Sequence, residues 1–231
     1  PLEENNVQVE KNHFLVFDGI SYEAYRVARI LEEASIPKER IHRYILQNLS
    51  SVALPINYMK YSLLPGQNAI ASAKTIVMAD APGGSNAVFP TFLARDVEKF
   101  VEGGGRLLVL GGYFTLERGE MKGSSLEKFL PVKLCGPFEG IKKVDIKKFL
   151  PKDKAYQWLE GMDFHLEYKH CLELCPDAEV LLDSVAGPVL VRGKYGQGEV
   201  LVFMAVPAGK TMDFTQYRCW SRLLKQMCAV E

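Results

Sequence analysis

The chain has 231 residues, 48% of them hydrophobic and 24% charged, which is ordinary for a globular protein with a substantial core. Lysine plus arginine and aspartate plus glutamate both total 28, so the formal net charge is zero. No excess of positive charge therefore points to nucleic acid or to an anionic membrane surface as a partner. We expect residues 1–231 to form a single domain, because a second full domain would be crowded at this length.

Neither membrane insertion nor secretion is expected from the sequence. No apolar run reaches the roughly eighteen residues that a membrane-spanning helix needs. Residues 1–11 are polar and acidic, unlike a signal peptide. The five cysteines are odd in number and irregularly spaced, which suits reduced thiols better than a disulfide framework. We therefore expect a cytoplasmic protein with no membrane partner.

The first half of the chain alternates between strands and helices. Residues 13–18 form an apolar run that predicts a strand, and residues 21–31 follow with an apolar stripe at helical spacing. Residues 40–46 alternate as an edge strand does. Residues 75–79 predict a buried strand, and a helix over 91–102 comes after the loop that follows it.

Three consecutive glycines at 103–105 end that helix, and the apolar run 106–110 predicts the next strand. The strands are continuously apolar rather than alternating, and helices separate them. This pattern is typical of an α/β protein whose parallel sheet is covered on both faces.

The pattern changes after residue 113, where short strands and tight turns replace the strand–helix alternation. The lysine-rich stretch 142–148 predicts a solvated face, and Trp220 in the last helix predicts core packing more than a partner surface. The elements expected here are a short helix at 121–130, strands at 180–182, 189–191 and 200–203, and a final helix at 214–229.

Two sequence blocks resemble a known family. They are F-V-E-G-G-G-R-L-L-V-L-G-G-Y-F at 100–114, followed by L-P-V at 130–132, and K-Y-G-Q-G-E-V-L-V-F at 194–203. Together they are similar to a bacterial family of cytoplasmic proteins described as glutamine amidotransferases. That family belongs to the class I glutamine amidotransferase-like superfamily and is related to trehalose-utilisation-like domains. The resemblance implies a flavodoxin-like, three-layer α/β/α fold with a mostly parallel sheet and functional groups at the carboxyl ends of the strands.

The resemblance also locates a missing nucleophile. Catalytic members carry a strand, a sharp turn of the form G-x-C-x-G and a helix whose N-terminus lowers the pKa of the cysteine thiol. The matching stretch here is 111–115, where Tyr113, or Gly112 if the register slips by one, takes the cysteine position and Thr115 replaces the last glycine. None of the five cysteines lies at an equivalent turn. We therefore expect no glutaminase activity by the usual route.

The strand-end crevice that such folds use for ligands remains a candidate site. Asp18 and Asp80 end predicted strands, although each could instead cap a helix or hold a loop in place. The loop before the 91–102 helix could bind an anion through backbone N–H groups, or it could be only a tight crossover turn. The ligand-binding residues that we predict are Asp18, Asp80, Gly84, Ser85, Asn86, Gly111, Gly112 and Tyr113.

Two further patterns are weaker than they first look. His165 and Glu167 have the His-x-Glu spacing of the amidotransferase base and its orienting carboxylate, but the proline usual between them is missing. His165, His170, Cys171 and Cys175 are zinc-ligand types, but their spacing is not that of a zinc knuckle, and His170 and Cys171 would face opposite sides of a strand. We expect no metal and no cofactor.

Three functions stay open at this point. The first is a non-catalytic domain that binds a small polar molecule, such as a sugar-related metabolite, in the strand-end crevice. The second is a hydrolase or lyase that uses Tyr113 and Asp80, which would require a strong perturbation of the tyrosine pKa from about 10. The third is an assembly module with a vestigial site, and self-association as a homo-oligomer is compatible with the first function.

Overall fold

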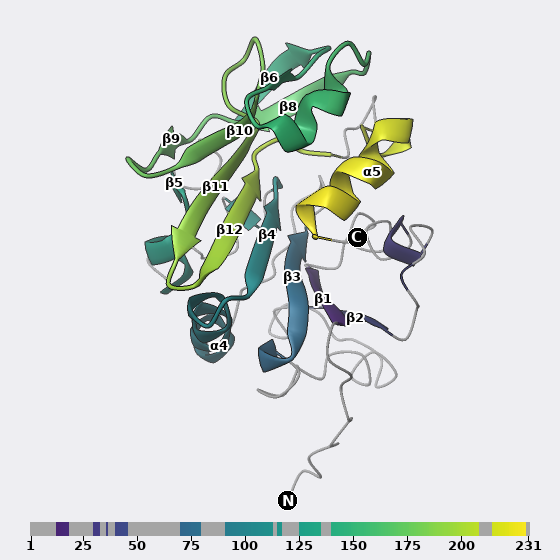
Figure 1. Ribbon diagram of the computed structural model, residues 1–231. Helices are drawn as coiled ribbons and strands as arrows, with labels where there is room; N and C mark the ends of the chain where they lie inside the picture. Colours follow the sequence, from purple (N-terminus) through teal and green to yellow (C-terminus); the bar gives the residue numbers. More distant parts are fainter. Residues whose placement is uncertain are drawn as a thin grey trace, which may run out of the picture.

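The computed structural model describes residues 13–18, 30–32, 36, 40–45, 70–79, 91–112, 115–116, 125–134, 140–207 and 214–229, with only the backbone at 13–18, 41–45 and 91–93. These residues form a mixed α/β structure built around one eight-stranded sheet (Figure 1). The strand order is β2-β1-β3-β4-β12-β11-β10-β7.

The first five strands in this order are parallel to one another. Apolar runs separated by long connections build this half, as expected for crossover topology. Because the strands share one direction, their carboxyl ends meet at the same edge of the sheet. The strands are β1 (His13–Asp18), β2 (Ile41–Ile45), β3 (Ala73–Ala79), β4 (Arg106–Leu110) and β12 (Gly198–Phe203).

The other half of the sheet is antiparallel, so the sheet as a whole is mixed with a parallel majority. Four of the seven strand pairings in the described sheet are parallel and three are antiparallel. The physical reason is the short turns of the second half, since Gly196 with φ 57° closes a hairpin that leaves no room for a crossover helix. The added strands are β11 (Leu190–Tyr195), β10 (Glu179–Asp183) and β7 (Leu150–Pro151).

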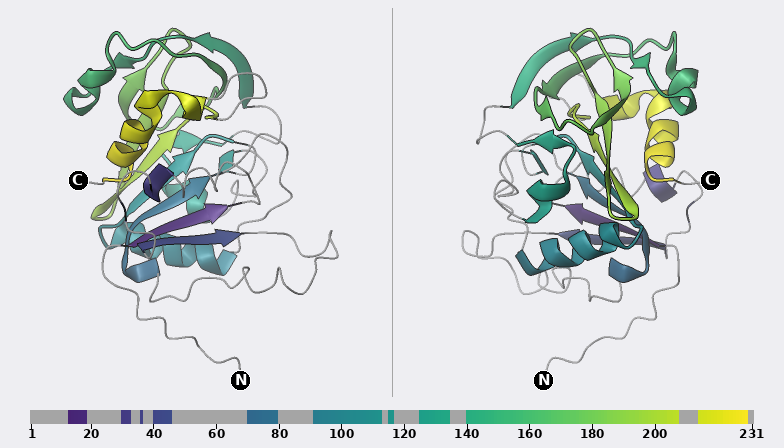
Figure 2. Two further views of the ribbon diagram at one scale, coloured as in Figure 1. Left: turned by 90° about the vertical axis from the view of Figure 1, so that its right-hand side faces the viewer. Right: turned by 60° about the vertical axis from the view of Figure 1, so that its left-hand side comes forward.

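Helices cover both faces of the sheet (Figure 2). Helix α4 (Thr91–Glu102) packs on the face that buries Ile76, Val109 and Val202, and α5 (Arg218–Met227) packs on the opposite face. Successive strand residues point to opposite faces, so an uninterrupted apolar run supplies both cores. Among the described residues, no helix has the length and apolar character needed to cross a membrane.

The smaller elements refine the predicted boundaries. Within the predicted 121–130 helix, the structure shows the 3-10 helix η3 (Ser125–Phe129). The predicted final helix divides into η5 (Phe214–Gln216) and α5, because the backbone of Tyr217 between them is extended. A further 3-10 helix is η4 (Lys154–Leu159), and two-stranded sheets join β5 (Val132–Lys133) to β9 (Glu173–Leu174) and β6 (Ile141–Ile146) to β8 (Leu166–His170).

Two predictions about side chains are confirmed. Trp220 is fully buried and packs against Phe203 and Phe214, at ring-centroid distances of 5.9 and 5.7 Å. Lys142 and Lys143 on β6 are exposed. Of the predicted helix at 21–31, only residues 30 and 31 are described, and both are helical.

Candidate functional site

The carboxyl ends of β4 and β12 meet in a tightly closed corner. The Gly111 N–H donates to Phe203 O at 2.7 Å, which continues the β4–β12 pairing one residue past β4. A Cβ atom on Gly111 would lie 2.4 Å from Ala205 O, so only glycine allows the two backbones to approach this closely. Glycine at position 111 is therefore required by packing at this corner.

Strand β8 crosses this corner. The His170 N–H donates to Met204 O at 2.8 Å, and the Val206 N–H donates to Tyr168 O at 2.9 Å. An antiparallel bridge joins Lys169 to Ala205 between these two bonds. The segment that follows β12 is thus paired with β8 through its backbone, which places two titratable side chains, Lys169 and His170, at the carboxyl edge of the parallel strands.

The His170 side chain accepts a hydrogen bond from a backbone N–H of the turn that follows β4. Its Nε2 accepts a hydrogen bond from the Gly112 N–H at 3.0 Å, and the imidazole is fully buried. A ring nitrogen that accepts a hydrogen bond carries no proton, so Nε2 is unprotonated while this bond exists. The Gly112 N–H is therefore not available to a ligand or to a developing negative charge.

Thr115 closes the same turn from the other side. Its hydroxyl donates to Leu110 O, lies 3.3 Å from Gly112 O, and is fully buried. The Leu116 N–H donates to Gly112 O at 3.3 Å, which is a helical type of contact. Threonine at the position of the amidotransferase glycine thus satisfies a carbonyl inside the turn.

Lys169 is a buried amine with few partners. Its side chain is 3% exposed, and Nζ donates to His170 O at 3.0 Å. Burial lowers the pKa of Lys169, while Cys171 and Asp183 act in the opposite direction. An ammonium has three N–H donors, and within the described ranges only one of those of Lys169 has a hydrogen-bond acceptor.

The structure describes three of the eight predicted site residues. Asp18 ends β1 and is paired in register with Ala79 at the end of β3, which confirms the strand end but says nothing of the carboxylate. Gly111 and Gly112 lie at the corner just described. The predictions for Asp80, Gly84, Ser85, Asn86 and Tyr113 concern residues outside the described part of the chain.

The two weaker sequence patterns take different forms in the structure. The His165 imidazole pairs with Asp145, with Nε2 and Oδ1 at 3.0 Å, so the partner seen for His165 is not Glu167. His170 at the end of β8 is buried at the corner, whereas Cys171, just after the strand, is exposed. Among the described residues, no three histidine, cysteine, aspartate or glutamate side chains are grouped as metal ligands.

Sequence reasoning missed Lys169 and the placement of His170 beside Gly112. The one signal available was a pair of adjacent titratable residues at the end of an amphipathic strand. That signal does not say which backbone the strand will pair with, since the pairing of β8 with residues 204–206 joins segments more than thirty residues apart.

Comparisons with known proteins support the fold and leave the function open. No family model matches the sequence, and no curated protein matches it. Two cytoplasmic proteins of Salmonella typhimurium have similar structures, with TM-scores of 0.69 and 0.67 and sequence identities of 17% and 16%. The matches cover 94% of this chain in both cases, and 98% and 99% of those chains.

A ThuA-like protein from Bacteroides uniformis is also similar, with a TM-score of 0.53 and 11% identity over 95% of this chain and 89% of that chain. At these identities the likeness concerns the fold alone. The fold of this chain is thus consistent with a ThuA-like domain.

Proposed function

We propose that this chain is a non-catalytic domain of the class I glutamine amidotransferase-like superfamily that binds a small polar molecule at the carboxyl edge of its sheet. The observation that carries the proposal is the bond from the Gly112 N–H to His170 Nε2. This bond uses the N–H donor of the turn in which catalytic relatives would activate a cysteine. The proposal includes a cytoplasmic location, which the cysteine content and the cytoplasmic descriptions of the two Salmonella proteins support.

The strand order supports the flavodoxin-like part of the proposal. The parallel strands follow the order β2-β1-β3-β4-β12, which is the 2-1-3-4-5 order of flavodoxin-like sheets when β12 is counted as the fifth strand. Ligands of such sheets bind where the strand order reverses, between the first and third strands. Asp18 ends β1 at this place, and Asp80 directly follows β3.

The proposed absence of glutaminase activity rests on the chemistry of the turn. A glutaminase needs a thiolate that attacks the amide and N–H groups that stabilise the resulting oxyanion. Gly112 and Tyr113 supply no thiol, and His170 and Thr115 already occupy the polar backbone groups around the turn. These residues make a stable corner rather than a reactive one.

The buried amine gives the ligand site its polarity. Lys169 has no carboxylate within ion-pair distance among the described residues, and in this proposal the ligand accepts from the other donors of its ammonium. Sugar-related compounds with a polar or anionic substituent are the first class to test, because the sequence resembles trehalose-utilisation-like domains and an anionic group would compensate the buried charge.

Thermal unfolding with a panel of sugars, sugar phosphates and sugar acids tests the proposal. A ligand present at about 100 times its Kd should stabilise the protein by about 2.7 kcal/mol. Lys169→Met and Tyr113→Ala should abolish this stabilisation, whereas Lys142→Met on exposed β6 should keep it. A panel in which no compound raises the Tm, or a ligand whose effect survives both site variants, would contradict the proposal.

A further inference from the structure

A row of charged side chains crosses the α5 face of the sheet near the amino ends of β4 and β12. The charges alternate in sign from strand to strand. Arg106 Nε donates to Glu199 Oε1 at 2.8 Å, and Arg192 Nη2 donates to Glu179 Oε2 at 2.7 Å. Both pairs are register neighbours, so the sheet itself holds them opposite one another. The row consists of Arg106 on β4, Glu199 on β12, Arg192 on β11 and Glu179 on β10.

A cavity of about 340 Å³ lies beside this row, and we call it the amino-edge cavity. Leu181 and Leu201 contribute apolar surface, Asp153 and Tyr156 line it from the start of η4, and Gln226 lines it from α5. This volume is at the lower end of the range of about 300–1,000 Å³ for small-molecule sites. All of its lining residues belong to the described part of the chain.

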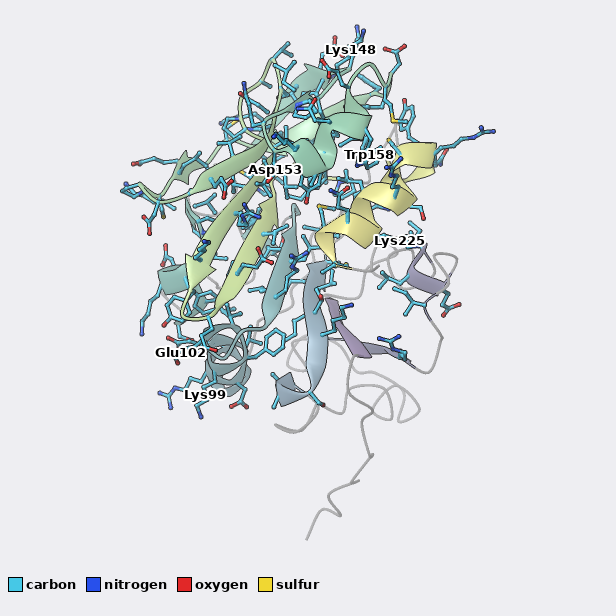
Figure 3. The ribbon with its side chains drawn as sticks, viewed as in Figure 1. Lys99, Glu102, Lys148, Asp153, Trp158 and Lys225 are labelled. Carbon is cyan, nitrogen blue, oxygen red and sulfur yellow. The ribbon has the colours of Figure 1, made fainter. Side chains whose placement is uncertain are left out.

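Hydrogen bonds between η4 and α5 fix the walls of the cavity. Trp158 Nε1 donates to Gln226 Oε1 at 2.7 Å, and Gln226 Nε2 donates to Ala155 O at 2.6 Å. Figure 3 shows Trp158 between η4 and α5, and Asp153 at the start of η4. The cavity therefore has a preformed shape, which reduces the entropic cost of binding.

The polar groups around the cavity divide into those already bonded and those still open. Arg106 uses four of its five donors, because Nε and Nη2 bond Glu199 and Nη1 donates to Gln226 O and Met227 O, at 3.3 and 3.1 Å. Arg192 is less complete. Its Nη2 lies 3.7 Å from Asp153 Oδ2, and its Nη1 lies 4.0 Å from Glu199 Oε2, which are both too long for hydrogen bonds.

Tyr156 adds a hydroxyl to these open groups. The residue is 4% exposed, and burial raises its pKa to about 12, so the phenol is protonated at neutral pH. It can both donate and accept a hydrogen bond. Arg192, Asp153, Glu199 and Tyr156 thus offer donors and acceptors that alternate around a small space with an apolar floor.

We propose that the amino-edge cavity binds a neutral polyhydroxyl compound of about monosaccharide size, at a site separate from the one proposed at the carboxyl edge. A hydroxyl group can accept from the Arg192 guanidinium and donate to the Asp153 or Glu199 carboxylate, so it bridges the gaps of 3.7 and 4.0 Å. Leu181 and Leu201 suit the C–H face of a sugar ring. The row and Asp153 together hold three carboxylates and two guanidiniums, which disfavours an anionic ligand.

Asp153→Asn is the sharpest variant for the test. Asp153 Oδ1 accepts from the Ala155 N–H at 2.8 Å as the cap of η4, and asparagine caps about as well as aspartate. The change therefore keeps η4 in place while it replaces the open Oδ2 acceptor with an amide donor. Tyr156→Phe similarly removes the hydroxyl and keeps the buried ring. Lys142→Met is the control, since Lys142 is exposed on β6 and does not line the cavity.

Titration calorimetry of the full chain should use glucose, mannose, trehalose and myo-inositol, with glucose 6-phosphate as the anionic comparison. We expect at least one neutral compound to bind, and its Kd to rise by about tenfold in Asp153→Asn and in Tyr156→Phe, as for a lost hydrogen bond to a charged or buried group. Lys142→Met and Lys169→Met should leave that Kd within about twofold.

Two results would overturn the proposal. One is the absence of saturable binding for all four neutral compounds. The other is binding that Asp153→Asn and Tyr156→Phe leave unchanged, because the charged row would then serve only to fasten α5 to the sheet. Binding that Lys169→Met abolishes would assign the sugar to the carboxyl edge and equally contradict a separate site.

Discussion

The bond between Gly112 and His170 gives the most direct test of how the corner is stabilised. His170→Leu keeps a side chain of similar size but removes the acceptor, so a buried backbone N–H loses its partner. An unsatisfied buried donor costs about 1–3 kcal/mol. For a chain of this length each kcal/mol corresponds to about 2–4 °C, so we expect the Tm to fall by roughly 2–12 °C.

His170→Gln is the matched control, because its side-chain oxygen can still accept from Gly112. Urea unfolding followed by circular dichroism should show a smaller loss of unfolding free energy for glutamine than for leucine. A His170→Leu variant within about 0.5 kcal/mol of wild type would refute the reasoning, because changes of that size are typical of surface substitutions. It would mean that the Gly112 N–H finds another acceptor, and that β8 does not block the turn.

Two other changes probe the same edge. Gly111→Ala would place a Cβ 2.4 Å from Ala205 O, a backbone atom that cannot move aside as a side chain can. Urea titrations should therefore show an unfolding free energy lower by about 1–3 kcal/mol or more. A variant as stable as wild type would contradict this packing. Lys169→Met should stabilise the ligand-free protein near neutral pH. Between the lowered pKa of Lys169 in the folded protein and about 10.5 in the unfolded chain, the unfolded chain binds more protons. The unfolding free energy of the wild type should therefore rise with pH in that window. The difference in unfolding free energy between Lys169→Met and the wild type should shrink accordingly. Urea titrations from pH 7 to 10.5 measure this trend, and an advantage that is constant or grows with pH would refute it.

Local sequence predicted the elements of the parallel half well. The apolar runs of β3 and β4, the amphipathic α4 and the glycines after it all depend on interactions within a few residues. Strands β10, β11 and β12 are also predicted, but not that β10 and β11 extend the same sheet past β12 or that β12 pairs with β4. Pairing of β12 with β4 joins residues about ninety positions apart, and periodicity carries no information on such partners.

The candidate site shows the same limit more sharply. The Gly111–Gly112 turn was predicted because its motif is contiguous, and its missing thiol is visible in the sequence. The acceptor for the Gly112 N–H comes from His170, 58 positions away, and reaches Gly112 only because β8 pairs with residues 204–206. The sequence offered His170 as a metal-ligand type, but in the structure it bonds the Gly112 N–H, a contact that depends on the pairing of strands far apart in the sequence.

The two polar regions of the sheet differ in how their charges are compensated, and this difference distinguishes the ligands proposed for them. At the carboxyl edge, Lys169 is buried without a carboxylate at ion-pair distance among the described residues, so a ligand with a negative or strongly polar group relieves an existing cost. At the amino edge, Arg106 and Arg192 already pair with Glu199 and Glu179, and an added charge would compete with those pairs. Binding of a neutral hydroxylated compound disturbs neither pair. A sugar phosphate should therefore select the carboxyl edge and its neutral parent the amino-edge cavity, which single substitutions at Lys169 and Asp153 can separate.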